Sequence, residues 1–154
     1  MPGELLDSAK IAFVKGRFDE AADLFGQVLE KMPGHLMAYQ SRGAARVKLE
    51  DFEGAVEDFT AFIQAHGTNE KVYGSRGTAY LALKKYDEAM DDFNRAIELN
   101  QFYPNAYFGR AELFTIAGEQ EQAKMDRDTG SQIQRKMSQS HFESQGVMFQ
   151  DPDA

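Results

Sequence analysis

The segment YGSRGTAY at residues 73–80, followed by KYDEAMDDF at residues 85–93, decides the fold because variants of it recur along the chain. The repeat length is 34 residues, and four copies begin at Pro2, Leu36, Glu70 and Pro104. A fixed internal period of this kind indicates stacked copies of one supersecondary unit. The chain is therefore expected to be a repeat protein.

Within each copy, counted from position 1 to position 34, two positions hold only small residues. Small side chains let two helices cross closely. Position 8 holds Ala9, Gly43, Gly77 and Ala111, and position 20 holds Ala21, Ala55, Ala89 and Ala123. Aromatic residues fill two other positions of the first three copies, Phe18, Phe52 and Tyr86 at position 17 and Phe25, Phe59 and Phe93 at position 24. Apolar residues also recur at spacings of three and four, so each copy predicts two amphipathic helices and the chain predicts eight.

This pattern resembles the tetratricopeptide-repeat (TPR) family, which has small residues at positions 8 and 20, aromatic residues at positions 17 and 24, and a turn near position 15. The resemblance implies an all-α fold, a right-handed α-solenoid of about four helix pairs with a concave groove. The expected TPR domain is residues 2–137, with repeats at 2–35, 36–69 and 70–103 and a degenerate copy at 104–137. Position 11, where the family usually has tyrosine, is Ala12 in the first copy and Arg46 in the second.

The fourth copy is polar where the earlier copies are apolar, as the end of a solenoid requires. Gln120, Arg127 and Ser131 replace aromatic or aliphatic residues there. We therefore expect a polar capping helix that runs to about His141 and completes both the array and the chain. Residues 138–154 should contain the end of that helix and a flexible, irregular tail. The apolar cluster in this tail, Val147-Met148-Phe149, either docks on the protein or stays disordered.

Arginine and aspartate occur together at two further positions of the last three copies. Position 7 holds Arg42, Arg76 and Arg110, and position 23 holds Asp58, Asp92 and Asp126. The first copy has Ser8 and Leu24 in these places, so both partners are present or both are absent. Antiparallel helices can bring the two positions together, which predicts three structural ion pairs. The alternative is an arginine row that grips a phosphate or a carboxylate tail, but the matched loss in the first copy favours the ion pairs.

In the TPR family, positions 2, 5, 9 and 12 of each first helix line the concave face. The resemblance therefore implies a peptide-binding groove lined by Leu6, Lys10, Phe13, Met37, Gln40, Ala44, Val47, Lys71, Thr78, Leu81, Phe108 and Glu112. Apolar members of this set would lie open to water, so we expect an apolar or amphipathic protein or peptide ligand. The alternative for these side chains is packing between neighbouring first helices.

One TPR class holds acidic C-terminal tails with a clamp of lysine, asparagine and arginine, and this sequence departs from it. The clamp positions are Leu6, Lys10, Ser41, Lys71 and Ser75, of which only Lys71 matches. An acidic protein would also gain little from an acidic ligand. We therefore do not expect a chaperone cofactor of that class.

Composition excludes several classes of function. The chain has 154 residues with a net charge of -8, which repels nucleic acid and anionic lipid surfaces. It has no cysteine, no apolar stretch long enough to span a membrane and no secretion signal, so we expect a cytoplasmic protein. The three histidines are scattered, and no phosphate loop or catalytic triad is recognisable. We expect neither an enzyme nor a bound cofactor or metal.

Two functions fit these observations. The first is an adaptor or scaffold that holds a partner's peptide or helix in the groove. The second is a self-assembling structural protein, a homo-oligomer in which repeat faces or the tail of one copy occupy the groove of another.

Overall fold

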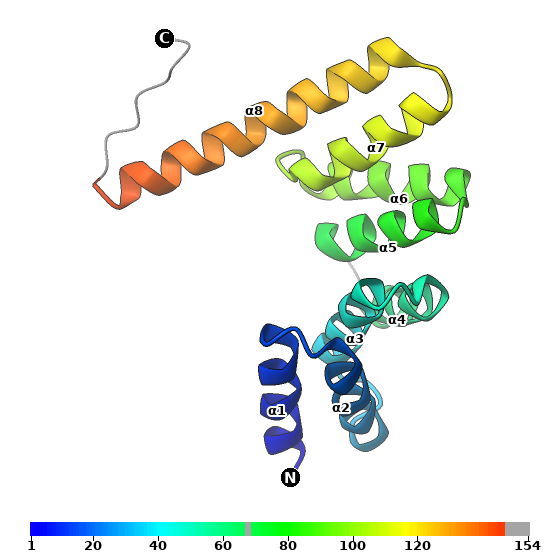
Figure 1. The fold of residues 1–154 in the computed structure, drawn as a ribbon, viewed down its shortest axis with the longest axis vertical. Helices are drawn as coiled ribbons and strands as arrows, with labels where there is room; N and C mark the ends of the chain where they lie inside the picture. The colour runs from blue at the N-terminus through cyan, green and yellow to red at the C-terminus, as the bar shows by residue number, and fades with distance from the viewer. Residues whose placement is uncertain (67–68, 147–154) are drawn as a thin grey trace.

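The computed structural model describes residues 1–66 and 69–146, and all the secondary structure in this part of the chain is helical. The elements are α1 (Pro2–Val14), α2 (Phe18–Lys31), α3 (Leu36–Lys48), α4 (Phe52–His66), α5 (Glu70–Ala82), α6 (Tyr86–Leu99), α7 (Pro104–Ile116) and α8 (Gln120–Ser144). Each helix packs against the next, and α5 also contacts α3 and α7. The four pairs follow one another in a curved row (Figure 1). The predicted all-α solenoid of helix pairs is confirmed.

A residue with left-handed backbone closes the turn inside every pair. Gly16, Glu50, Lys84 and Gly118 have φ angles of 75°, 59°, 59° and 80°, and all four stand at position 15 of the repeat. The following N–H group donates to the carbonyl at position 11, as Arg17 does to Ala12 at 2.9 Å. This pattern ends a helix and reverses the chain. The turn expected near position 15 is therefore built by the backbone itself.

The apolar core of the described residues is a row of three clusters, each containing the phenylalanine of position 24. Phe25, Phe59 and Phe93 are each only 1% exposed. A Cβ atom added to Gly43 would come within 2.7 Å of the Phe59 ring, and one added to Gly77 within 2.9 Å of the Phe93 ring. The small residues of position 8 thus provide the space that the aromatic rings of position 24 occupy.

The last pair is polar, and its second helix is unusually long. Position 24 of this copy is Arg127, which is exposed and donates to Thr115 Oγ1 at 3.1 Å. The helices α2 and α6 both end at position 30, whose counterpart in α8 is Ile133. Residues 134–137 contain no proline or glycine to stop a helix, so α8 continues to Ser144, slightly beyond the expected end. The cluster Val147-Met148-Phe149 lies outside the described residues.

Candidate functional site

An arginine–aspartate contact joins the two helices in each of the last three pairs. Arg42 Nη2 lies 2.7 Å from Asp58 Oδ1, Arg76 Nε lies 2.7 Å from Asp92 Oδ2, and Arg110 Nε lies 2.7 Å from Asp126 Oδ2. The aspartate side chains are 2%, 5% and 9% exposed. Each arginine bonds both carboxylate oxygens, the bidentate geometry that makes such pairs strong. These carboxylates are turned into the fold, where they hold helix pairs together.

The charged state of the Asp92 carboxyl group depends on Arg76. Hydrogen bonds to aspartate raise the pKa of Arg42, Arg76 and Arg110 above the usual range, which keeps the guanidinium groups charged. Burial raises the pKa of the Asp92 carboxyl, and the two hydrogen bonds from Arg76 oppose that rise. Removing Arg76 would leave the cost of burying a carboxylate uncompensated.

Two of these arginines also bond the preceding helix pair. Arg76 Nη1 donates to Thr60 Oγ1 of α4 at 3.2 Å, and Arg110 Nη1 donates to Asn94 Oδ1 of α6 at 3.0 Å. The residue that corresponds to Thr60 and Asn94 in the first helix pair, next to Arg42, is Gly26, which has no side chain to accept a bond. Arg42 and Gly26 instead line a polar cavity of about 590 Å³ beside α2.

Replacing Gly26 by threonine should therefore stabilise the protein. A Cβ atom at this position would lie 3.5 Å from Arg42 Nη1, an ordinary contact, and the hydroxyl could accept the bond that Thr60 accepts from Arg76. We expect the free energy of unfolding to rise by about 1 kcal/mol from the added hydrogen bond and the removal of a helical glycine. Urea denaturation would measure it. Gly26→Val has the same shape without the hydroxyl and is the control; equal effects of both substitutions would contradict the hydrogen bond.

Arg46 belongs to the same network, although the sequence reasoning did not single it out as a site residue. Its Nη1 atom lies 3.0 Å from Asp58 Oδ2 and donates to the Gly54 carbonyl at 3.2 Å. Arg46 follows Arg42 by one helical turn, so the two side chains share a face of α3. An arginine at the position usually held by tyrosine, one turn after a predicted ion-pair residue, is the signal that could have identified it.

Most of the apolar side chains predicted to line the groove are partly packed against the core clusters. Leu6 and Phe13 pack against the first core cluster, Val47 against the second and Leu81 against the third. Met37 is exposed, at 38%. Leu6, Phe13, Val47 and Leu81 are half-buried, so contacts between helices cover part of the apolar surface that was expected to line the groove.

Phe108, which was also expected in the groove, lies against α8. A Cβ atom added to Gly130 would come within 2.9 Å of the Phe108 ring, so the ring contacts the α8 backbone there. Gly130 is buried in the middle of α8 and causes no break in the helix. Its lack of a side chain makes room for Phe108.

The remaining predicted groove residues are polar or small. Lys10, Lys71, Thr78 and Glu112 are exposed, and Gln40 and Ala44 are half-buried. Some members of the predicted set border a small hollow between α3 and α5, with a volume of about 180 Å³. Its lining is mainly apolar and consists of Ala44, Val47, Lys48, Phe59, Ser75 and Thr78.

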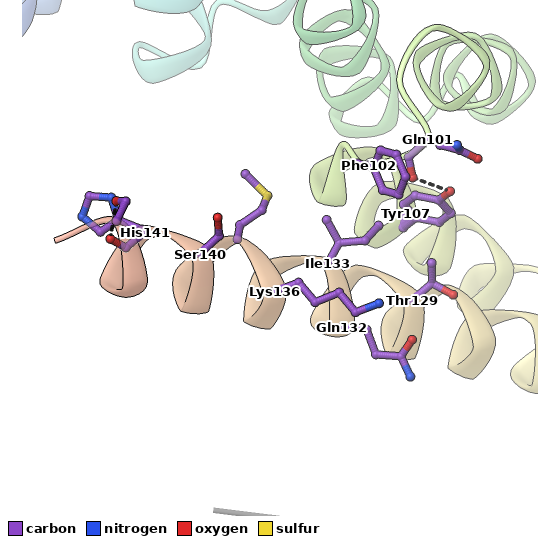
Figure 2. A pocket seen from close by; sticks show the side chains of 11 residues that line it. Gln101, Phe102, Tyr107, Thr129, Gln132, Ile133, Lys136, Ser140 and His141 are labelled. Carbon is purple, nitrogen blue, oxygen red and sulfur yellow. Dashed lines mark hydrogen bonds between the residues drawn. The ribbon is translucent and has the colours of Figure 1, made fainter. Parts of the chain in front are cut away.

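A larger cavity, of about 750 Å³, lies between α8 and the loop that joins α6 to α7. Figure 2 shows Phe102 and Tyr107 on one side of it and Ile133 and Lys136, from α8, on the other. The Tyr107 hydroxyl donates to the Gln101 carbonyl at 2.9 Å, which ties the loop to α7. The sequence reasoning did not anticipate this cavity. The sequence signal for it is a pair of apolar residues four apart, Ile133 and Met137, in a mostly polar helix.

Within residues 1–66 and 69–146, no group of three or more histidine, aspartate or glutamate side chains is placed to hold a metal ion. None of the helices described there combines the length and the apolar character needed to cross a membrane.

The fold is similar to several solved TPR structures. The MamA protein superimposes with a TM-score of 0.80 at 22% identity, covering 95% of this chain and 83% of that one. MamA 41-end from Desulfovibrio magneticus RS-1 gives 0.82 at 18% identity, covering 88% and 77%. The Arabidopsis OM64 TPR domain gives 0.71 at 24% identity, covering 74% and 94%. At these identities the likeness shows the fold alone.

The sequence matches known families directly. No curated protein matches the chain significantly. Two families described as tetratricopeptide repeat do match, one over residues 6–70 and the other over residues 70–103. Together the two matches span more than half of the chain. Their ends lie near the ends of helix pairs in the structure. The chain therefore belongs to the tetratricopeptide-repeat family, which supports a general role as a protein-interaction scaffold.

Proposed function

We propose that the chain is a non-catalytic adaptor that binds a peptide or helix of a partner protein on the face formed by α1, α3, α5 and α7. The observation that carries this proposal is the hollow between α3 and α5. A cavity of about 150 Å³ is enough to hold benzene. The hollow, at about 180 Å³, could therefore seat one apolar side chain of a ligand.

The residues around the hollow suit recognition of an amphipathic segment. Ala44 and Val47 offer apolar contact, while Lys48, Ser75 and Thr78 offer hydrogen bonds at the rim. Lysines 10 and 71 are exposed on α1 and α5, so a ligand could combine an apolar anchor with acceptor groups. The hollow itself brings no carboxylate or histidine to a reactive centre, which favours binding over catalysis. The net charge of -8 disfavours nucleic acid as the partner.

Filling the hollow should weaken binding without unfolding the protein. Ser75→Leu would place an aliphatic side chain where the ligand's anchor is proposed to sit. Peptides selected from a random library on the parent protein should share an apolar anchor residue, and their affinity should fall at least about tenfold on Ser75→Leu, as the loss of a central anchor predicts. Isothermal titration calorimetry with the selected peptides would measure the loss.

The matched control is Ser138→Leu, which makes the same substitution at an exposed position of α8. It should leave peptide affinity unchanged. Circular dichroism would check that both variants are folded. Full affinity in folded Ser75→Leu would place the binding site elsewhere.

A further inference from the structure

We infer that the cavity between α8 and the α6–α7 loop is a docking site for the chain's own C-terminal segment, residues 147–154. This site is separate from the groove proposed above. The segment lies outside the described residues, whereas the cavity and the end of α8 lie within them. Three features point to this occupant: the exposed apolar wall of the cavity, the turn that ends α8, and the chemistry of the segment.

The cavity has an apolar wall that is open to water. Phe102 is 63% exposed and Met137 is 56% exposed, although both are large apolar side chains. Buried Ile133 and half-buried Tyr107 lie beside them in the same cavity of about 750 Å³. Exposed apolar surface gathered in a cavity of this size is typical of a binding site.

The end of α8 has a turn that takes the chain off the helix axis beside this cavity. Gly146 has a φ angle of 75°, and its N–H group donates to the Glu143 carbonyl at 3.0 Å. A left-handed glycine at the end of a helix turns the chain away from the helix axis. Ser144 and His141 themselves line the cavity, so the segment starts at its edge.

The length and order of residues in the segment fit the cavity. An extended chain advances about 3.3 Å per residue and a helix about 1.5 Å, so each segment residue passes roughly two residues of α8. Running back along α8, the segment would bring Phe149 level with Ser140 and Met137. Asp151 would then lie level with Lys136, whose exposed ammonium group complements its charge.

The same segment from a second copy could in principle fill the cavity. Attachment to the same chain gives the segment an effective concentration in the millimolar range. At micromolar protein concentration, the intramolecular contact therefore prevails.

Paramagnetic broadening in NMR spectra would test the docking. The sequence has no cysteine, so Ala154→Cys gives a single site for a nitroxide label on the full chain. A docked, extended segment would place the label near Thr129. We therefore expect the largest loss of amide signal around residues 129–133 and a smaller loss at Ser144. An undocked segment would give the opposite gradient, strongest at Ser144.

A matched pair of variants ties the result to the cavity. Met137→Glu puts a charge into the apolar wall and should shift the strongest signal loss from residues 129–133 to Ser144. Met125→Glu makes the same change at a site that is 69% exposed on the same helix but outside the cavity, and it should leave the gradient as in the parent.

Two outcomes would overturn the inference. The first is a gradient that is strongest at Ser144 in the parent protein, or that Met137→Glu leaves unchanged. The second is broadening in a mixture of label-bearing protein and isotope-enriched protein without the label, because that would assign the contact to a second copy.

Discussion

Replacing Arg76 by alanine is expected to lower the free energy of unfolding by about 3 kcal/mol, because it removes one partner of a buried ion pair. Asp92 is 5% exposed and would lose both hydrogen bonds that compensate its charge. Thr60 would lose the bond that joins the second helix pair to the third. Urea denaturation followed by circular dichroism would measure the change.

The control is Arg95→Ala on the adjacent helix α6. Arg95 pairs with Glu98 at 3.0 Å, but the two side chains are 45% and 66% exposed. Exposed pairs contribute little, so the denaturation midpoint should stay almost unchanged. Replacing Arg76 and Asp92 together by leucine should recover much of the lost stability, since no buried charge then remains. If Arg76→Ala proved as mild as Arg95→Ala, the pair would not be a structural element of the fold.

The second large effect is expected at Gly109, where alanine should destabilise the protein by about 2 kcal/mol. Alanine is the better helix former by about 1 kcal/mol, so propensity alone predicts the opposite sign. In the structure, a Cβ atom at Gly109 would overlap the ring of Phe93, which is 1% exposed and cannot move aside freely. Thermal unfolding would show a lower melting temperature.

Gly26→Ala is the matched control for this prediction. A Cβ atom there meets only Arg42 Nη1, at 3.5 Å, so propensity should decide and the melting temperature should rise. Melting temperatures that change in the same direction for both variants would show that the Phe93 contact does not control the response.

The period of 34 residues was sufficient to predict the helices and their pairing. Alanine or glycine at positions 8 and 20, with phenylalanine at position 24, specifies where two helices cross and what fills the space between them. The same logic brings Arg76 and Asp92 together, because their positions face each other in an antiparallel pair. Because these features recur in several copies, each copy supports the interpretation of the same positions in the others.

The groove was harder to predict because spacing reveals which side of a helix a residue occupies but not what covers it. Leu81 stands at a groove position and still packs against the third core cluster. Phe108 is covered by α8 at Gly130, a contact that depends on one glycine in one copy. The repeat pattern could not predict the cavity beside Ile133, because this cavity exists only where α8 continues past the point at which α2 and α6 end.

The division of the core into three clusters has a consequence for how quickly the protein folds. Each cluster, centred on Phe25, Phe59 or Phe93, draws its residues from helices close in sequence. Chains whose contacts are mostly local fold fast, because few long loops must close before native contacts form. Folding can therefore begin in any pair and spread to its neighbours, without the two ends of the described chain having to meet.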